Sequence, residues 1–511
     1  MNSYDAIVIG SGFGGSMAAK QLVDAGMKVL MLERGDWVKR SVEENWGPKG
    51  SIDLSPFYDK SSLLYVPVGG NKPTMGLYSC VGGPSVFYGG VSFRFREADF
   101  EKNEQIEGKD AQGWPIKYND LESYYTQAEG ILSISGETGI DPTEPRRSAP
   151  LPQHAPALAN ISQKVKSSAQ KLGLHPFQLP LAINYEDTSR QTCLNCKTCD
   201  TFACAVSAKN DLATTVIPQL MAKGMELQHN MVVTKLNVQN GRIVSVDCVS
   251  KTTKQQHTFK ADKFILAAGS LGTPHILLSS GLPQYNPCGD VVGRYLMRHL
   301  NSIIFGIFPG VADKEGRFHK QLAILDYYFG HPKAPEFNKL GSLQQMPTPP
   351  GSVVENELKG VLGKMLSPAV KLLSGLLAIV EDQPQYNNAL TIDPSNPDEF
   401  GLPRPIINHN YSDRDNAAMK ILTDEGKKIM KGAGALTHYV HEIRTFSHAV
   451  GTVRMGSNEK TSALDENCRF RGIENLYVTD GSVMPTSAAL NPSLTIAANA
   501  LRVGEIITKS N

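Results

Sequence analysis

The stretch Asp5-Ala-Ile-Val-Ile-Gly10-Ser-Gly12-Phe13-Gly14-Gly15 decides the fold of this 511-residue chain. Its apolar run up to Gly10 is typical of a buried parallel strand. Residues 16–26 predict a helix closed by glycine, and residues 27–32 predict a second strand with Glu33 at its end. This order of strand, glycine turn, helix, strand and acid predicts a βαβ unit that binds a dinucleotide.

Each residue of the turn has a physical task in dinucleotide binding. Gly10 permits the tight turn, Gly12 lets a pyrophosphate approach the backbone, and Gly15 lets the helix pack closely on the strand. The free N–H groups and the positive dipole end of the helix face the phosphates. Glu33 can accept hydrogen bonds from an adenosine ribose. A glycine turn that binds nothing is the alternative, but the strand, helix and acid around it argue against that. These residues alone leave NAD and FAD open.

The overall composition excludes several classes of function. Lys and Arg number 51 against 50 Asp and Glu, so the formal net charge is +1. Without a basic excess, we expect no nucleic-acid binding. The most apolar stretch, 361–380, is interrupted by Lys364, Pro368 and Lys371, which argues against a membrane-spanning helix. Since a strand pattern begins at Tyr4, no secretory signal is expected. We expect a cytoplasmic protein, with export alongside a partner subunit as the alternative.

The last part of the chain carries a second set of signals. Residues 475–481 predict a strand that ends in Asp480 and Gly481. A helix is predicted from Pro492 onward, with Asn491 as its N-cap residue. The N-terminus of that helix can face the part of a cofactor ring where negative charge develops on reduction.

Several motifs follow one another along the chain. They are Gly113-Trp-Pro-Ile-Lys-Tyr-Asn-Asp-Leu-Glu-Ser-Tyr-Tyr125, Gly269-Ser270-Leu-Gly-Thr273-Pro274 through Leu282, Val292-Gly293-Arg294 followed by His299, His448 with Gly451-Thr452 and Arg454-Met455-Gly456, and Asn491-Pro492. In this order they resemble the glucose–methanol–choline (GMC) family of FAD-dependent oxidoreductases, over nearly the whole chain. One departure is Pro283, where the family usually has glycine.

The resemblance implies the fold class and the domain organisation. We expect an α/β protein whose Rossmann-type FAD-binding domain spans residues 1–135, 190–299 and 446–511. A discontinuous α+β substrate-binding domain with an antiparallel sheet is expected from residues 136–189 and 300–445. Glu33-Arg34-Gly35 favours FAD over NAD, because in similar FAD enzymes the acid is commonly followed by a basic residue and glycine.

The expected cofactor-binding residues come from the opening turn and from the resemblance. They are Gly10, Gly12, Phe13, Gly14, Gly15, Glu33, Arg34, Gly82, Ser85, Tyr88, Gly89, Gly90, Val233, Ala268, Gly269, Asp480, Gly481, Asn491, Pro492 and Ser493. For Val233, an ordinary place in a core strand is an equal alternative. Tyr88 stands where family members usually have Asn. Some members attach FAD covalently through a histidine in this loop. Because Phe87 and Tyr88 offer none, we expect non-covalent FAD.

His448 and Asn491 are the expected catalytic residues. Alcohol oxidation removes a proton from the hydroxyl group, and a neutral imidazole near pH 7 is suited to accept it. We expect Asn491 to hold the hydroxyl so that the C–H bond points at flavin N5. The alternative for His448 is a histidine at a strand end that only makes structural hydrogen bonds. The alternative for Asn491 is a residue that caps its helix, either as its only role or together with the catalytic one.

The sequence therefore predicts an FAD-dependent oxidoreductase that oxidises an alcohol hydroxyl, such as that of a sugar, a polyol or a sterol-like compound. Three alternatives stay open. The first is an oxidase of the same family, which uses oxygen and releases peroxide. The second is an NAD-dependent reductase, which Glu33-Arg34 and the C-terminal motifs disfavour. The third is a catalytically silent flavin- or lipid-binding protein, against which His448 and Asn491 argue.

Four of the eight cysteines crowd into one short segment. Cys193, Cys196, Cys199 and Cys204 have spacings at which thiolates ligate an iron–sulfur cluster or zinc. The last spacing is one residue longer than in the bacterial ferredoxin run, and Ala205 stands where that run has proline. A turn of packed thiols or a reversible disulfide is therefore favoured over a metal site. A cluster here would carry electrons from the flavin to an acceptor protein or a quinone.

Two stretches of the expected substrate domain carry weaker signals. Residues 359–380 are apolar with three lysines. They predict an amphipathic lid, a membrane-surface helix, or a segment buried against its own domain. Glu381 and Asp382 are expected at a solvated strand end rather than at the active site.

Overall fold

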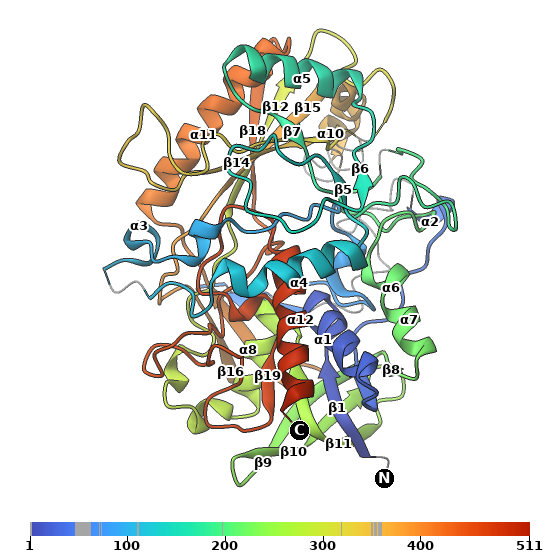
Figure 1. Ribbon diagram of the computed structural model, residues 1–511, viewed down its shortest axis with the longest axis vertical. Helices are drawn as coiled ribbons and strands as arrows, with labels where there is room; N and C mark the ends of the chain where they lie inside the picture. Colours follow the sequence, from blue (N-terminus) through green and yellow to red (C-terminus); the bar gives the residue numbers. More distant parts are fainter. Residues whose placement is uncertain are drawn as a thin grey trace.

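A seven-stranded sheet lies at the end of the computed structural model that holds both chain termini (Figure 1). Its order is β8-β2-β1-β11-β10-β9, and β19 also pairs with β11. The strands are β1 (Ser3–Ile9), β2 (Val29–Leu32), β8 (Glu226–Gln228), β9 (Met231–Gln239), β10 (Arg242–Ser250), β11 (Gln256–Leu266) and β19 (Leu476–Val478). The structure describes residues 3–45, 63–70, 72, 74–109, 112–196, 198–317, 319–348, 351, 355 and 360–510.

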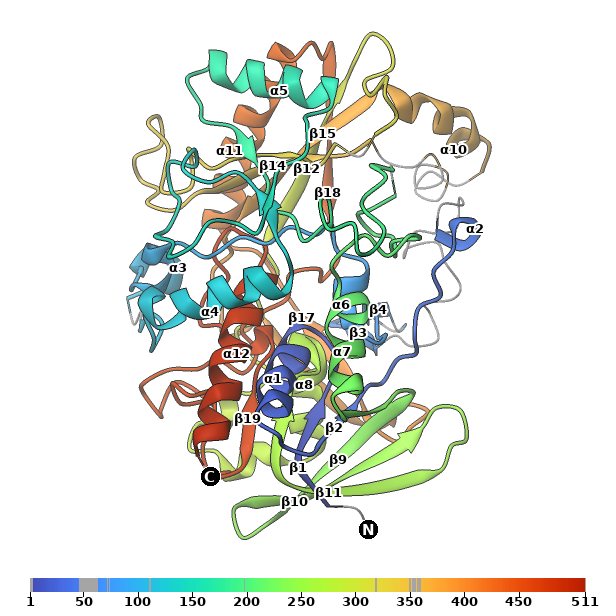
Figure 2. The ribbon, with the colours of Figure 1, turned by 45° about the vertical axis from the view of Figure 1, so that its right-hand side comes forward.

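The centre of this sheet is parallel, as the sequence predicts. β1 pairs in parallel with β2 and β11, and β19 continues the parallel part on the other side of β11. Ala6, Ile7 and Val8 are fully buried, which explains the uninterrupted apolar run. β9, β10 and the first half of β11 form an antiparallel meander, which extends from the lower end of the molecule in Figure 2.

Four long helices pack around the seven-stranded sheet. α1 (Phe13–Asp24) connects β1 to β2 and lies side by side with α12 (Ser493–Lys509). α12 also packs against α4 (Tyr118–Ile131), and Figure 1 shows the three helices together. α8 (Gly269–Ser279) follows β11 and contacts β9. The first and last segments of the chain are thereby joined in one hydrophobic core.

A six-stranded antiparallel sheet forms the opposite end of the molecule. Its order is β18-β12-β15-β14-β13-β7, with β7 (Phe177–Gln178), β12 (Leu300–Ile307), β13 (Leu322–Ile324), β14 (Gly341–Met346), β15 (Leu373–Val380) and β18 (Thr437–Ile443). The helices α5 (Asn160–Lys171) and α11 (Asp413–Gly432) share a core with alternate residues such as Ile304 and Leu343. The intervening residues, among them Ile303, Phe305 and Leu377, form a separate cluster on the other face.

Two smaller sheets and several short helices complete the fold. The four-stranded sheet has the order β16-β17-β3-β4, and β5 pairs with β6. These strands are β3 (Leu63–Pro67), β4 (Thr74–Leu77), β5 (Ser135–Gly136), β6 (Gln153–His154), β16 (Ala389–Pro397) and β17 (Pro403–Asn408). The short helices are α2 (Val42–Asn45), α3 (Glu104–Glu107), α6 (Leu212–Thr215), α7 (Ile217–Ala222) and α10 (Gly360–Leu366). The 3₁₀ turns are η2 (Gly83–Val86), η3 (Glu97–Phe100), η4 (Leu282–Tyr285), η5 (Gly289–Val291), η6 (Ser367–Leu372) and η7 (Gly481–Val483).

The sheets can be compared with the predicted domains. Every strand of the seven-stranded sheet comes from the residues expected in the FAD-binding domain. Every strand of the six-stranded sheet comes from those expected in the substrate-binding domain. The four-stranded sheet draws on both sets. The domain boundaries themselves stay a prediction.

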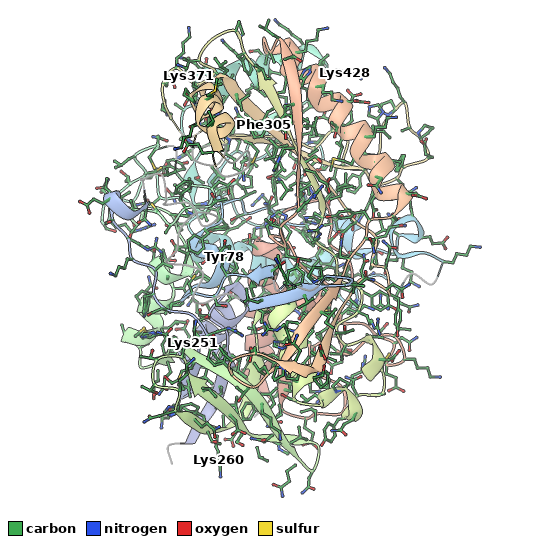
Figure 3. All side chains as sticks on the ribbon, turned by 180° about the vertical axis from the view of Figure 1, so that it is seen from behind. Tyr78, Lys251, Lys260, Phe305, Lys371 and Lys428 are labelled. Atoms are coloured by element: carbon green, nitrogen blue, oxygen red, sulfur yellow. The ribbon has the colours of Figure 1, made fainter. Side chains whose placement is uncertain are left out.

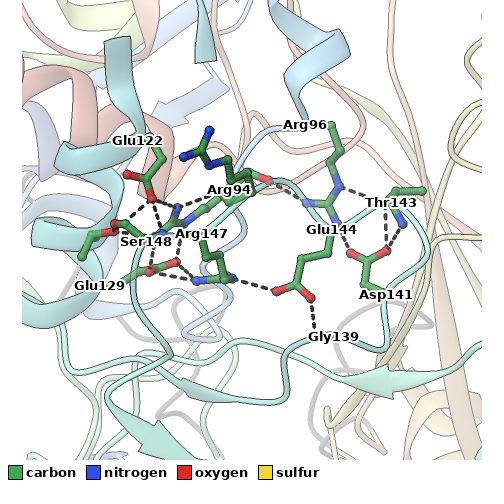
Figure 4. A network of polar contacts seen from close by, with 12 residues as sticks. Arg94, Arg96, Glu122, Glu129, Gly139, Asp141, Thr143, Glu144, Arg147 and Ser148 are labelled. Carbon is green, nitrogen blue, oxygen red and sulfur yellow. Dashed lines mark hydrogen bonds and ion pairs between the residues drawn. The ribbon is translucent and has the colours of Figure 1, made fainter. Parts of the chain in front are cut away.

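A buried ion network ties α4 to the loop that follows it (Figure 4). The guanidinium of Arg94, which is fully buried, contacts Glu129 at 2.7 Å and Glu122 at 3.0 Å. Arg147 lies 2.8 Å from the other oxygen of Glu129 and 2.7 Å from Glu144. Since each charge has an opposite partner, the network crosslinks these segments without leaving a bare buried ion.

Residues 359–380 do not form one amphipathic helix. α10 and η6 are followed by β15, an inner strand of the six-stranded sheet, and Lys371 marks the turn before it (Figure 3). The helix alternatives are wrong for this second half because an inner strand buries both faces and so shows no polar stripe, whereas the alternative of a segment buried against its own domain is confirmed for β15. α10 leaves Val361 76% and Met365 71% exposed, so membrane-surface contact stays a prediction for α10. Lys359 lies outside the described residues. Within the described ranges, no helix is long and apolar enough to cross a membrane.

Candidate active site

The opening turn packs tightly on one side and borders open space on the other. Gly10 has φ +102°, and a Cβ added there would lie 2.3 Å from the carbonyl oxygen of Ala267. At Gly15 a Cβ would lie 1.9 Å from the carbonyl oxygen of Gly10, so the helix approaches the strand as predicted. At Gly12 it would meet no described atom within 4 Å. That open position at the start of α1 fits a pyrophosphate.

Glu33 is tied to the opening turn from the end of β2. One carboxylate oxygen accepts hydrogen bonds from the backbone N–H (3.0 Å) and the hydroxyl (2.6 Å) of Ser11. The other oxygen accepts from the N–H of Gly35 at 2.8 Å. Burial raises the pKa of Glu33 above its ordinary value. Arg34, also expected to bind the cofactor, has a buried Nε with no hydrogen-bond partner among the described residues.

Loop 82–90 meets the opening turn, as expected of a cofactor-contacting loop. A Cβ at Gly83 would lie 3.0 Å from the Cα of Gly12. The rings of Phe13 and Tyr88 meet edge to face with centroids 5.5 Å apart. The hydroxyl of Tyr88 is buried, and Ser92 is the side chain that interacts with it.

Ser85 has a structural role in this loop. Its hydroxyl donates to the carbonyl of Gly82 at 2.6 Å and accepts from the N–H of Leu212 at 3.2 Å. Direct contact of Ser85 with FAD stays a prediction.

The predicted C-terminal segment around Asp480 lies next to the opening turn. Asp480 accepts hydrogen bonds from the N–H groups of Gly269 (2.9 Å) and Ser482 (2.8 Å). A Cβ at Gly14 would lie 2.5 Å from the carbonyl oxygen of Thr479. The buried hydroxyls of Ser270 and Thr479 have no hydrogen-bond partner among the residues described. Together with the open side of Gly12, these free hydroxyls fit a dinucleotide such as FAD.

The other predicted cofactor residues lie in the surrounding backbone. Gly89, Gly90, Ala268 and Gly481 belong to the converging loops, and the hydroxyl of Ser493 donates to the carbonyl of Val91 at 3.1 Å. Val233 is buried in β9, within the main core. The contacts of all these residues with FAD stay predictions.

The structure brings the two predicted catalytic residues together. Asn491 and His448 are 43 residues apart, and Nδ2 of Asn491 lies 3.2 Å from Nε2 of His448. Burial lowers the pKa of His448 well below its ordinary value, with smaller contributions from the charges of His299 and Lys320. The imidazole is therefore neutral near pH 7, as a base requires.

Asn491 is not the N-cap of the last helix. Pro492 occupies that position, and no side chain caps α12. The prediction is wrong because the amide of Asn491 has other partners: its oxygen accepts from Nε2 of Gln344 at 2.8 Å, and its nitrogen faces His448. Pro492, predicted as the first helical residue, is instead the N-cap, and the helix begins at Ser493. Gln344, on β14, brings the six-stranded sheet to the catalytic pair, and no role is predicted for it from sequence.

His299 lies directly behind His448. Their Nδ1 atoms are 3.0 Å apart, and Nε2 of His299 lies 3.0 Å from the carbonyl oxygen of Ser487. His299 stands in a motif that resembles the GMC family, but its sequence context assigns it no role. The sequence feature that could have indicated a role for His299 is its position directly before the apolar run that forms β12.

Glu381 and Asp382 are not at a solvated strand end. They are 0% and 1% exposed. Asp382 accepts from the N–H of His299 at 3.1 Å, and Glu381 accepts from the N–H of Ala488 at 3.0 Å. His299 (φ +56°) and Ala488 (φ +52°) both have left-handed backbones. The two acids therefore hold strained turns on either side of the catalytic pair. The prediction is wrong because their partners are backbone amides, which a sequence does not display.

An ion pair borders the same site. Lys320 lies 2.5 Å from Asp200, and both meet loop 82–90, since a Cβ at Gly89 would be 3.1 Å from the ammonium nitrogen. The charge of Lys320 contributes to the lowered pKa of His448, the predicted base.

The cysteine segment packs against loop 82–90. The ammonium of Lys209 donates to the carbonyls of Val86, Cys199 and Phe202 at 2.8–3.1 Å. All eight cysteines are free. Among the described residues, no group of three or more His, Cys, Asp or Glu side chains is arranged to hold a metal ion. Burial raises the pKa of Cys193 to about 11, so its thiol carries a proton at neutral pH. A metal site at these four cysteines stays the less favoured prediction.

Comparison with known proteins identifies the family. Models of the N- and C-terminal parts of GMC oxidoreductases match residues 4–301 and 384–500. The chain belongs to the GMC oxidoreductase family. The predicted resemblance and the Rossmann-type fold class are thereby confirmed. As a GMC oxidoreductase, the protein is an FAD-dependent enzyme that acts on CH–OH groups, as the sequence predicts.

Relatives and solved structures agree with this assignment. The chain is 29% identical to 6'''-hydroxyparomomycin C oxidase of Streptomyces lividus over 526 residues, which cover 99% of this chain and 91% of the relative. It is 26% identical to 2-methyl-1,2-propanediol dehydrogenase of Mycolicibacterium austroafricanum over 540 residues, which cover 99% and 95%. The crystal structure of pyridoxine 4-oxidase from Mesorbium loti has a TM-score of 0.71 at 17% identity, with 100% of both chains covered.

Proposed function

We propose that this GMC oxidoreductase oxidises the hydroxyl group of a sugar, a polyol or a similar alcohol, with His448 as the base and Asn491 as the orienting amide. The observation that carries the proposal is the 3.2 Å contact between Asn491 Nδ2 and His448 Nε2. The relatives named above support the substrate class, since their names describe an oxidase of 6'''-hydroxyparomomycin C and a dehydrogenase of 2-methyl-1,2-propanediol.

The two side chains would divide the work as follows. Oxidation of CH–OH to C=O releases one proton and one hydride. Nε2 of His448 accepts the proton, because its pKa leaves the imidazole neutral at pH 7. Asn491 donates an uncharged hydrogen bond to the substrate oxygen, and Gln344 holds the amide in place at 2.8 Å. FAD, when bound, supplies the acceptor for the hydride at its N5 atom.

The residues of loop 82–90 favour FAD that is not covalently attached. The loop contains no histidine, and Phe87 and Tyr88 stand at its centre. Acid precipitation of the holoenzyme should therefore release the yellow chromophore into the supernatant. Colour that stays with the precipitate contradicts non-covalent binding.

The function is tested by flavin bleaching. The FAD holoenzyme is mixed anaerobically with a panel of sugars, polyols, primary alcohols and sterols, and absorbance of the oxidised flavin is followed. At least one alcohol should bleach it. His448→Ala should keep FAD bound and lose the bleaching by at least about 10²-fold. Wild-type reduction rates in this variant would reject the base assignment. A silent flavin- or lipid-binding protein predicts no bleaching at all.

The same experiment identifies the electron acceptor. Air is admitted after bleaching, and the return of colour is timed. An oxidase recolours rapidly and releases peroxide, whereas a dehydrogenase recolours slowly until a quinone or an acceptor protein is added. The relatives include both an oxidase and a dehydrogenase. A cytoplasmic location stays a prediction, which cell fractionation tests.

A further inference from the structure

A series of hydrogen bonds connects His448 through His299 to the backbone carbonyl of Ser487, a group that can only accept a hydrogen bond. A backbone carbonyl can only accept, and that of Ser487 lies 3.0 Å from Nε2 of His299. His299 must therefore carry a proton on Nε2. A neutral imidazole has one N–H and one lone pair, so the lone pair of His299 is on Nδ1.

The next step follows from the distance between the two rings. Nδ1 of His448 lies 3.0 Å from Nδ1 of His299. Since His299 offers a lone pair there, His448 must donate, and its own proton stays on Nδ1. The lone pair of His448 is then on Nε2, the atom that faces Asn491 and the substrate side.

We propose that His299 is a positioning residue that fixes the tautomer of His448, so that the nitrogen facing the substrate is always the unprotonated one. This inference rests on the proposed role of His448 as the base. It adds the reason why that base has its lone pair on the correct side.

The hydrogen bonds on the other side of His448 run in the same direction. Nε2 of Gln344 donates to the oxygen of Asn491 at 2.8 Å, so the amide presents its N–H group to His448. An N–H donor 3.2 Å away needs an acceptor at Nε2 of His448. The hydrogen bonds therefore run in one direction through four side chains, which are Gln344, Asn491, His448 and His299.

The backbone conformation of His299 orients its imidazole ring. The residue has φ +56°, a conformation that histidine and asparagine tolerate better than most residues. Asp382 secures this turn by accepting the N–H of His299 at 3.1 Å and the hydroxyl of Ser487 at 2.9 Å. The carboxylate thus holds both His299, whose ring donates, and Ser487, whose carbonyl accepts that hydrogen bond.

A doubly protonated His299 would reverse the effect. Its Nδ1–H would donate to His448 and force the proton of His448 onto Nε2, where it blocks the base. The charged and titratable groups around the pair are Asp382, which acts on His299 and lies 3.7 Å from His409, and Lys320, which acts on His448. Burial lowers the pKa of His299, so the neutral form is present at pH 7.

The tautomer is measured directly by NMR on the FAD holoenzyme labelled with [¹⁵N]histidine, without substrate. The His448 signals are assigned by their loss in His448→Ala. We expect the ¹⁵N shift of an unprotonated nitrogen for Nε2 and of a protonated nitrogen for Nδ1. In His299→Leu, which removes the acceptor, both nitrogens should shift towards intermediate values. His299→Asn is the matched control, since it keeps an oxygen at the place of Nδ1 and tolerates the left-handed backbone.

Flavin reduction by the best alcohol of the bleaching screen provides the second measurement. The wrong tautomer in a comparable catalytic triad costs about 10⁴-fold in rate, so His299→Leu should lose about 10²–10⁴-fold. His299→Asn should stay within about tenfold of the wild type, as expected if an acceptor is what His448 needs.

Two outcomes would overturn the proposal. One is a wild-type spectrum with the proton of His448 on Nε2. The other is a folded His299→Leu protein with the wild-type tautomer. If the leucine variant does not fold, the wild-type and asparagine spectra still decide. If no alcohol reduces the flavin, the proposed function fails, but the NMR result on the tautomer stands apart from it.

Discussion

Replacing Asp382 with asparagine should lower the free energy of unfolding by about 3–5 kcal/mol. The carboxylate is 1% exposed. One oxygen accepts from the N–H of Arg298 at 2.8 Å, and the other accepts from the N–H of His299 at 3.1 Å and the hydroxyl of Ser487 at 2.9 Å. Asparagine keeps one oxygen and turns an NH₂ group towards a backbone N–H. That unsatisfied donor costs about 1–3 kcal/mol, and the two remaining bonds each lose about 1 kcal/mol of charge assistance.

The assay is urea unfolding of the holoenzyme, followed by tryptophan fluorescence at pH 7. Glu474→Gln is the control, because Glu474 is 68% exposed in its pair with Arg242 and should cost less than about 1 kcal/mol. A loss below about 1 kcal/mol in Asp382→Asn would refute the view that this acid secures the two turns.

The pH dependence of this variant has a defined sign. Burial alone would raise the pKa of Asp382, but contact with His409 and the charge of His299 hold it below the ordinary value. A lowered native pKa adds stability above the unfolded pKa, near about 4, and that stability is lost as the pH falls through the native pKa. The difference between wild type and variant should be full at neutral pH and shrink below about pH 4. A difference that widens on acidification is incompatible with this account.

Three further predictions follow from the site and the ion network. Lys320→Met should raise the pKa of His448 by removing a nearby cation, so the acid limb of flavin reduction should move to higher pH, and a limb that moves lower contradicts this. Gly12→Ala should leave apoprotein stability within about 0.5 kcal/mol but weaken FAD binding at least about tenfold in equilibrium dialysis, whereas Gly15→Ala should cost about 3 kcal/mol or more in urea unfolding. Glu129→Gln should cost about 3–5 kcal/mol in the same assay, because the buried guanidinium of Arg94 and the partly buried one of Arg147 lose their shared charge, and an unchanged unfolding midpoint would show that the network adds nothing.

The sequence predicts those parts of the fold that local patterns of residues mark. The strand, turn and helix of residues 3–24 follow from short-range rules, because burial on both faces and the glycine turn leave direct marks in the sequence. β15 shows the limit of such rules. Its residues are buried on both sides of a sheet, so the apolar pattern resembles that of a buried helix until the partner strands are known.

The candidate site was predictable only where a motif marks it. His448 and Asn491 were found through the family resemblance, and the structure brings them together. Gln344 and His299 contact them across 147 and 149 residues, distances that no sequence period spans. The acids at 381–382 were misplaced for the same reason, since their amide partners lie 83 and 107 residues away.

The place of Gln344 within β14 limits how the chain length can change. Gln344 stands opposite Ala323 of β13 and Leu377 of β15, on the face turned towards Asn491. Side chains alternate between faces, so deleting one residue from the strand would send Leu343 to Asn491 and Gln344 into the helix-covered core. Insertions and deletions that preserve catalysis must therefore fall in the connecting loops, or come in pairs within a strand.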